Sequence, residues 1–491
     1  MSCPVVGHIR RRARAVLALA LCGLAVTAGF TGRPASAAPP SVEAGPALDW
    51  LAGQLSRNGG SLPGFSPGSS DWGLTVDAVL AFVAAGRSSD PAAEAATDLL
   101  VANAAEFTTW APEMPQVRVA GATAKLLLVV TAMGRDATAA RVDLDAELRA
   151  LMVSDGPAVG RFADRVPDPA WDSSNGFGQS LALLALAMTP DGVPAQATSY
   201  LLQQQCPAGG FRLSYVGSNG CSSDAEADTD ATAMALQALL AVPRSVEVSR
   251  ASQRAAAWLL SNQRSDGSFG GTGPTAAPNS NSTGLIAQSL RAAGQNEAAD
   301  RAAAWIAQHT WLDPATAAGT AAAAHVGAIA YQPASRATAL VEGITDLAAD
   351  QWRRATAQGV LAFGLAPFGP GGVDPLPPVT TTTVPPSSTT TTSTTTTTTA
   401  TSTTSTTSTL PARPPTAAPT PTDAPHSPPP EPPADASDVL DDTSTRPHDP
   451  GRDVGSRLAL TGAAPAPLVA GGISLLLLGA AMCVAADRRR R

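Results

Sequence analysis

Apolar residues recur at helical spacing through most of the chain between residues 41 and 369. Residues 231–240 and 125–130 are apolar almost all round, as helices are when neighbours cover them on every side. No segment shows the strict apolar–polar alternation of a half-buried strand, so no strands are predicted. The pattern therefore predicts an all-α domain over residues 41–369, made of about twelve to fourteen helices.

Two stretches of this domain repeat each other at a spacing of 58 residues, 200–211 and 258–269. In each, an aromatic residue near the end of a helix is followed by glutamine, a glycine loop and phenylalanine. A looser copy covers residues 50–65. Small polar clusters that suit helix N-caps then open a second helix; they occupy residues 70–75, 172–177, 228–232 and 279–283. Because neither helix of a pair can bury its face alone, neighbouring pairs must stack. The length of the domain has room for about six such pairs.

The repeat resembles the α/α-toroid superfamily, which includes squalene and terpene cyclases, protein prenyltransferase β-subunits and cobalamin carriers. The resemblance covers about residues 45–365. It rests on Leu-x-x-Gln before Gly-x-Phe and on residues 228–239. It implies a single ring of about six helix hairpins, one helix of each inside and one outside, with any ligand at the mouth where inner-helix N-termini gather. The candidate ligand residues there are Asp71, Asn175, Asp228, Asp230 and Asn281.

The cyclase branch of the resemblance concerns residues 228–231. Class II terpene cyclases protonate their substrate with the middle acid of Asp-x-Asp-Asp; here Asp230 matches that acid, but Ala231 replaces the last one. A general acid needs neighbours that keep it protonated, and only 4% of the residues are aromatic, whereas cyclases use aromatic rings to stabilise carbocations. The sequence favours a non-catalytic module in which Asp228 and Asp230 are an N-cap and a first-turn acid. In the alternative, an isoprenoid enzyme, Asp230 is the acid.

Other site chemistries have weaker support. Asp224, Glu226, Asp228 and Asp230 alternate at spacing two and form a weak calcium candidate, but no EF-hand register follows. His309 and His325 stand in contexts that do not suggest zinc, and no cofactor is predicted. Residues 232–236 resemble the inner-helix signature of the cobalamin carriers, which leaves a corrinoid-binding carrier as a further alternative. Those carriers add a small clamping β-domain that this sequence does not predict.

Both ends of the sequence carry targeting patterns. Arginines precede an apolar stretch and an Ala-x-Ala exit at residues 35–37, which predicts a secretory signal peptide over residues 1–37. The uncharged apolar run 463–486 is long enough to cross the ~30 Å hydrocarbon core as a helix. The four arginines that follow it place that end in the cytoplasm. Between the two, residues 370–457 are rich in Thr, Ser and Pro and predict a disordered, wall-spanning stalk.

The segment 458–491 resembles a sortase cell-wall sorting signal, in the Leu-Ala variant of high-G+C Gram-positive bacteria. Its pentapeptide is Leu458, Ala459, Leu460, Thr461 and Gly462. The resemblance implies cleavage after Thr461 and transfer to a peptidoglycan precursor; the alternative is an ordinary membrane anchor. We therefore expect a secreted protein, covalently anchored to the cell wall, with sortase and that precursor as partners. Further candidate partners are a small apolar or corrinoid ligand, a wall polymer and the surface of a partner cell.

Charge and cysteine content narrow the partners further. Of the 32 basic and 40 acidic residues, nine and one lie in the two targeting segments, which leaves a net charge of about −16. So acidic a protein argues against nucleic acid as a partner, because binding needs clustered Lys and Arg. Cys206 and Cys221 are the only cysteines outside the targeting segments. In an oxidising compartment they predict a disulfide worth about 3 kcal/mol in the chain-entropy model; metal ligation is the poorer interpretation.

Overall fold

The computed structural model describes residues 43–64, 66, 68–215 and 220–370, all within one compact unit of the chain. The predicted signal peptide, most of the stalk, the pentapeptide and the apolar run 463–486 lie outside the described residues. Over the part that is described, no helix combines the length and apolar character needed to cross a membrane.

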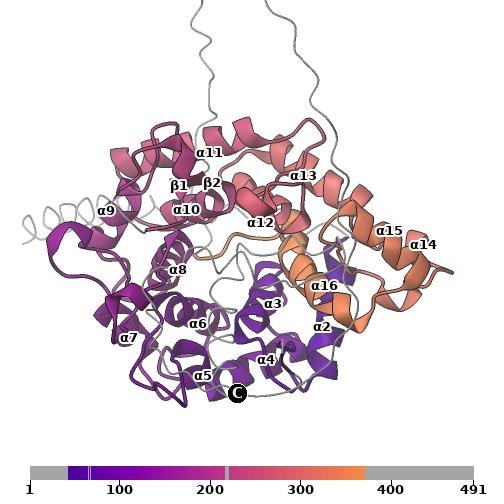
Figure 1. The fold of residues 1–491 in the computed structure, drawn as a ribbon, viewed down its shortest axis with the longest axis horizontal. Helices are drawn as coiled ribbons and strands as arrows, with labels where there is room; N and C mark the ends of the chain where they lie inside the picture. The colour runs from indigo at the N-terminus through magenta and orange to yellow at the C-terminus, as the bar shows by residue number, and fades with distance from the viewer. Residues whose placement is uncertain (1–42, 65, 67, 216–219, 371–491) are drawn as a thin grey trace, which may run out of the picture. The chain divides into compact units, whose positions relative to one another are not determined.

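Six helices of the described residues close into an inner ring (Figure 1). They are α3 (Trp72–Ala84), α6 (Ala120–Ala132), α8 (Gly176–Leu186), α10 (Thr229–Ala241), α12 (Ser280–Ala292) and α16 (Asp346–Gly359). Each packs on the next in this order, and α16 packs on α3, which completes the ring. All eleven residues of α8 are buried, because a helix inside the ring is covered by its two neighbours, its outer partner and the filled axis.

An outer layer of helices surrounds this ring (Figure 1). The outer and connecting helices are α2 (Ala44–Arg57), α4 (Pro91–Ala102), α5 (Ala104–Thr108), α7 (Leu144–Ala150), α9 (Ala195–Gln203), α11 (Val246–Asn262), α13 (Asn296–His309), α14 (Pro314–Ala317) and α15 (Pro333–Glu342). The 3₁₀ turns are η1 (Gly156–Ala158), η2 (Pro169–Trp171), η3 (Asp224–Glu226), η4 (Gly273–Thr275), η5 (Ala323–His325) and η6 (Val360–Ala362). Packing of α2 on α3, α7 on α6, α9 on α8, α11 on α10 and α13 on α12 confirms the predicted single α/α toroid.

One short strand pair corrects the expectation that the domain has no strands. β1 (Phe211–Arg212) and β2 (Ala227–Asp228) pair antiparallel, with Phe211 opposite Asp228. Two-residue strands carry too few side chains to show alternation, so the sequence pattern could not reveal them. The chain forms the pair because it doubles back between the glycine loop and α10.

The repeat is held by the same backbone contacts in several copies. The amide of Phe211 donates to Thr232 Oγ1 at 2.7 Å, and the amide of Phe269 donates to Thr283 Oγ1 at 3.0 Å. The equivalent pairs elsewhere are Leu62 with Thr75 and Ile329 with Thr356. Thr75, Thr232 and Thr283 each lie one turn into an inner helix, so the contact fixes the loop to the helix that follows it, whereas Thr356 lies near the end of α16.

The last described segment, residues 363–370, crosses the ring (Figure 1, orange) and is called the strap below. The amide of Ala366 donates to the carbonyl of Ala84 at 2.9 Å. Buried glutamines of two inner helices bind it further: Gln288 Nε2 donates to the Ala366 carbonyl at 2.5 Å, and Gln237 Oε1 accepts from the Phe368 amide at 2.9 Å. The strap thus ties the C-terminal ends of α3, α10 and α12 together.

Candidate functional site

Polar side chains cap the inner helices on one face of the ring, called the N-terminal mouth below. Asp71 accepts from the Leu74 amide at 2.8 Å, and Asp228 accepts from the Ala231 amide at 2.7 Å. Asn175 accepts from two amides at the start of α8, and Asn279 accepts from the first turn of α12. The capping predicted for the four polar clusters is therefore confirmed at these helices.

A small cavity lies on the axis of the ring below this mouth. It has a volume of about 10 Å³, which is the room for about one water molecule. Each inner helix contributes to its wall; the residues are Asp77, Lys125, Leu181, Met234, Leu285 and Gln358. Phe368 of the strap also lines it. This cavity is therefore far below the roughly 300–1,000 Å³ of a pocket that holds an organic ligand.

A buried ion pair crosses this axial layer. Lys125 Nζ lies 2.6 Å from Asp77 Oδ1 and donates to the Gly73 carbonyl at 2.8 Å. Only 3% of the lysine side chain and 14% of the aspartate side chain are exposed. Burial raises the pKa of the Asp77 carboxyl above its ordinary value, and the adjacent Lys125 ammonium opposes the shift. Lys125 was part of an apolar run in the sequence, and nothing there indicated its partner.

Asp230 and Asn281 lie one turn above that layer. They precede Met234 and Leu285 of the cavity wall by four residues, so their side chains are on the same axis-facing side of α10 and α12. Asp230 accepts from Ser282 Oγ at 3.0 Å. Asn281 is 9% exposed, and its Oδ1 has no hydrogen-bond partner among the described residues. These two predicted residues are therefore brought together at the mouth.

Asp71 belongs to a separate charged group at the same mouth. Its second oxygen lies 2.5 Å from the Arg354 guanidinium, which also binds Asp350 at 2.8 Å. Burial lowers the pKa of Arg354, but the two carboxylates outweigh it and leave that pKa raised. Sequence reasoning missed Arg354, because 283 residues separate it from Asp71 and only ring closure joins them.

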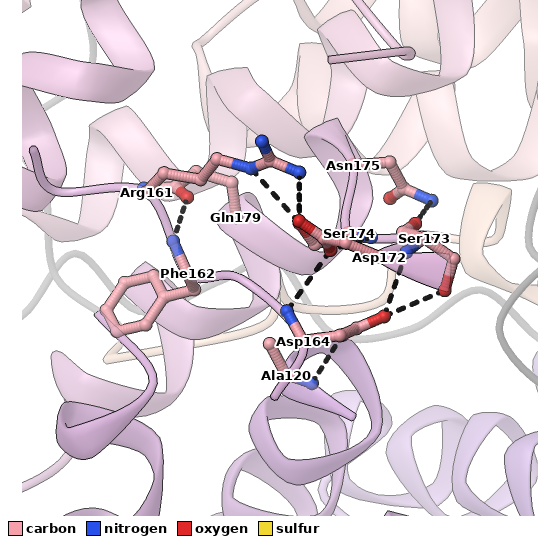
Figure 2. A network of polar contacts seen from close by, with 9 residues as sticks. All are labelled: Ala120, Arg161, Phe162, Asp164, Asp172, Ser173, Ser174, Asn175 and Gln179. Atoms are coloured by element: carbon pink, nitrogen blue, oxygen red, sulfur yellow. Dashed lines mark hydrogen bonds and ion pairs between the residues drawn. The ribbon is translucent and has the colours of Figure 1, made fainter. Parts of the chain in front are cut away.

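Asn175 stands at the edge of a third polar group, drawn in Figure 2. Asp164 accepts from the Ala120 amide at 2.8 Å and from Ser173 Oγ at 2.8 Å. Asp172 binds Arg161 at 2.7 Å. Burial raises the pKa of Asp164, while the hydrogen bonds from Ala120 and Ser173 oppose the shift. This group fixes residues 160–175 against the starts of α6 and α8.

The four carboxylates of the weak calcium candidate have separate partners. Asp224 accepts from the Ala208 amide at 2.7 Å, and Glu226 accepts from Ser222 and lies 3.4 Å from Arg212. Asp228 caps α10 and accepts from Thr272 Oγ1, while Asp230 binds Ser282. Over the described residues, no three His, Cys, Asp or Glu side chains converge as metal ligands. The alternation in sequence does not produce a shared site.

The remaining candidates are the two cysteines and the two histidines, and their contacts do not form a shared site. Cys206 and Cys221, the two cysteines paired in the sequence analysis, are joined by a disulfide that closes the loop before β2. His309 lies beside the ring of Trp305, with centroids 5.8 Å apart. Burial, followed by the charge of Arg57, lowers the pKa of His325. The two histidines lie in different parts of the outer layer.

Comparison with known proteins adds no family. No family model and no curated protein sequence matches the chain. Among solved structures, it is similar to a protein from Actinoplanes (19% identity, 65% of this chain and 97% of that one, TM-score 0.42). It is also similar to an unsaturated glucuronyl hydrolase from Bacillus sp. GL1, with 13% identity over 66% of this chain and 94% of that one and a TM-score of 0.41. A third similar structure is the ent-copalyl diphosphate synthase from Streptomyces platensis, with 22% identity over 64% of this chain and 53% of that one and a TM-score of 0.40. At these scores the likenesses do not assign a function.

Proposed function

We propose that the protein is a surface-display protein whose toroid head binds a partner without catalysis, carried on a stalk and anchored to the cell wall through Thr461. The observation that carries the non-catalytic part is the filled axis. Lys125, Asp77 and four side chains from the other inner helices leave about 10 Å³ between them. This axial cavity between described residues has no room for an organic ligand, so a partner would bind the outer surfaces of the head.

The alternative of an isoprenoid enzyme has one observation in its favour, the axis-facing position of Asp230. Three features oppose it. Ala231 stands where the cyclase motif has its last carboxylate, so Asp230 lacks one of the neighbours that keep a general acid protonated. The cavity beneath is too small for an isoprenoid. Phe368 is the one aromatic side chain among its lining residues, so few aromatic faces are available to a carbocation.

Native mass spectrometry of the full-length chain tests the non-catalytic head. We expect the mass of the polypeptide with its disulfide and no retained small molecule, in the wild type and in Asp230→Asn alike. A non-covalent mass excess that both variants keep would favour the carrier alternative instead. Conversion of an isoprenoid by the wild type but not by Asp230→Asn would contradict the proposal.

Cell fractionation tests the anchor. In the exporting bacterium, the wild type should resist extraction of the wall by hot detergent, because the bond to peptidoglycan is covalent. Thr461→Ala should become extractable, whereas Leu460→Ala, at the variable position of the pentapeptide, should remain in the wall. Equal extraction of all three would refute wall anchoring and leave an ordinary membrane anchor.

A further inference from the structure

Three asparagines of the chain are followed directly by glycine, at positions 58, 175 and 219. An asparagine side chain in this position is open to attack by the backbone nitrogen of the glycine, because no Cβ shields that nitrogen. The reaction closes a succinimide ring and releases ammonia. Position 219 lies outside the described part of the chain, so the structure compares the other two pairs, Asn58 with Gly59 and Asn175 with Gly176.

Asn58 stands at the C-terminal end of α2, and both it and Gly59 are exposed. Its Nδ2 donates to the Gln54 carbonyl at 3.4 Å, and the Gly59 amide donates to the Ser56 carbonyl at 3.4 Å. Both distances exceed the roughly 2.7–3.2 Å of an ordinary N–H···O bond. A Cβ on Gly59 would meet nothing within 4 Å, and the end of a helix frays readily. The attacking nitrogen and its target are therefore weakly held, with room for the ring to close.

Asn175 has the same neighbour in sequence but is firmly held. Its Oδ1 accepts from two amides in the first turn of α8, at 3.0 Å and 3.2 Å. The amide of Gly176 is buried and donates to the Leu213 carbonyl at 2.8 Å. A Cβ on Gly176 would lie 2.7 Å from the Arg212 carbonyl oxygen, so the backbone there is tightly enclosed. The nitrogen that would attack Asn175 is engaged, and the side chain is fixed away from it.

We propose that Asn58 is a site of spontaneous covalent modification, which converts with time to aspartate and isoaspartate while the fold preserves Asn175. The Gly59 nitrogen loses its proton to base and forms a bond to Asn58 Cγ, and the side-chain nitrogen leaves as ammonia. Water then opens the succinimide. Opening at one carbonyl gives an aspartate side chain; opening at the other gives isoaspartate, in which the backbone runs through the former side chain. Water is the only co-reactant, and no group is oxidised or reduced.

Both products change the junction between α2 and the loop that follows it. A carboxylate at position 58 replaces the donor to the Gln54 carbonyl and places negative charge at the C-terminal end of a helix, where the helix dipole disfavours it. Isoaspartate also lengthens the backbone just before Gly60, whose amide donates to the Leu55 carbonyl at 2.9 Å. That glycine is closely packed, because a Cβ on it would lie 2.7 Å from Leu99.

The position of α2 gives this change a consequence for the whole ring. α2 packs on α3, the first inner helix, and on α16, the last. Modification at its end therefore loosens the contact at which the ring closes. The inference goes beyond the proposed function, since it concerns how the head changes with age and not what it binds.

The test is incubation of the purified full-length chain at mildly alkaline pH, followed by peptide mass spectrometry. Conversion raises the mass of the peptide because oxygen replaces an NH group, and chromatography separates isoaspartate from aspartate. We expect Asn58 to convert at least roughly tenfold faster than Asn175 in the folded protein, where only Asn58 lies in a readily opened segment. In urea the two rates should converge, because glycine follows both residues and the fold alone separates them.

Two results would overturn the proposal: equal rates at Asn58 and Asn175 in the folded protein, or a difference between them that persists in urea. Asn58→Gln, which lengthens the side chain and disfavours ring closure, is the control. Hydrogen exchange of α2 should be faster in aged wild type than in fresh wild type, and unchanged by ageing in Asn58→Gln. Unchanged exchange after conversion would overturn the effect on ring closure. Neither readout involves wall anchoring or a partner, so a failure here and a failure of the proposed function are distinguishable.

Discussion

Lys125 is the only lysine of a chain that otherwise uses arginine, and it lies on the ring axis beside Asp77. An ammonium is compact, whereas a planar guanidinium needs more room and more acceptors. The space left beside Asp77 and Lys125 is about that of one water molecule, so there is little room for the larger group. The pair satisfies two charges that would be costly to bury singly.

Lys125→Met should destabilise the protein by about 3–5 kcal/mol, because Asp77 is left charged in a buried site. Burial already raises the pKa of Asp77, so the folded state holds this proton more tightly than the unfolded chain. The contribution of Asp77 to the free energy of unfolding therefore falls as the pH rises from the ordinary aspartate pKa through the raised pKa of the folded state. Loss of the Lys125 ammonium raises the folded pKa of Asp77 further and so widens this pH range. The free energy of unfolding measured in urea should therefore drop more on Lys125→Met at about pH 7 than at about pH 4.

The paired variant Lys125→Met with Asp77→Leu is the control. It removes both charges and keeps apolar volume on the axis, so it should recover most of the stability that Lys125→Met loses. The same penalty at both pH values, or no recovery in the double variant, would mean that packing of the lysine chain and not its charge matters.

At the scale of helices and loops, the repeat depends on close approach of the backbone. Gly209 and Gly267 have φ of +114° and +91°, and a Cβ at either would meet a carbonyl oxygen of the next outer helix, Arg254 at 2.6 Å or Arg301 at 2.5 Å. Just before each turn, Gln205 and Gln263 donate to the glycine carbonyl. The register of the two copies thus follows from a turn that admits only glycine.

Gly267→Ala should cost more than Gly86→Ala in thermal and urea unfolding. Both glycines have positive φ, but a Cβ at Gly86 meets nothing within 4 Å, so that variant should lose only about 1–2 kcal/mol for the left-handed conformation. At Gly267 the clash with the Arg301 carbonyl adds to this loss. Equal losses would show that the close approach is relieved by a small backbone shift.

At the scale of the whole head, the strap closes one end of the ring. Phe368 lines the axial cavity, and Gln237 and Gln288 hold the strap backbone. The two glutamines are themselves buried and joined at 3.1 Å, and each also bonds to the strap backbone. Removal of the strap would leave these groups without partners inside an apolar ring.

The single lysine makes this closure measurable. Phe368→Ala should speed amine-specific labelling of Lys125 by roughly tenfold, because a loss of about 1.4 kcal/mol from the closed strap raises its open population by that factor. Labelling is quantified by mass spectrometry, with the α-amino group as the internal reference. Val341→Ala, at an exposed apolar residue, is the control. Unchanged labelling in Phe368→Ala would show that the strap does not limit access to the axis.

The sequence alone determined the helical class, the stacked helix pairs and the helix caps, while closure of the pairs into a ring was implied by the resemblance to α/α toroids. The first three features depend on local periodicity, on glycine turns and on polar residues next to the helices that they cap, so residues 228–239 or 258–269 carry the information within a few turns of chain. The pairing of Cys206 with Cys221 was also readable, because no other cysteine remains outside the targeting segments.

Only the tertiary structure decided which side chains meet. Arg354 reaches Asp71 through closure of the ring, Lys125 reaches Asp77 from the next inner helix, and the strap reaches Gln237 across the ring. The carboxylates at positions 224–230 looked like one site in sequence, yet turns and a strand directed them to different partners. Periodicity specifies which face of a helix is buried, whereas the identity of the neighbour on that face depends on how the six inner helices close together.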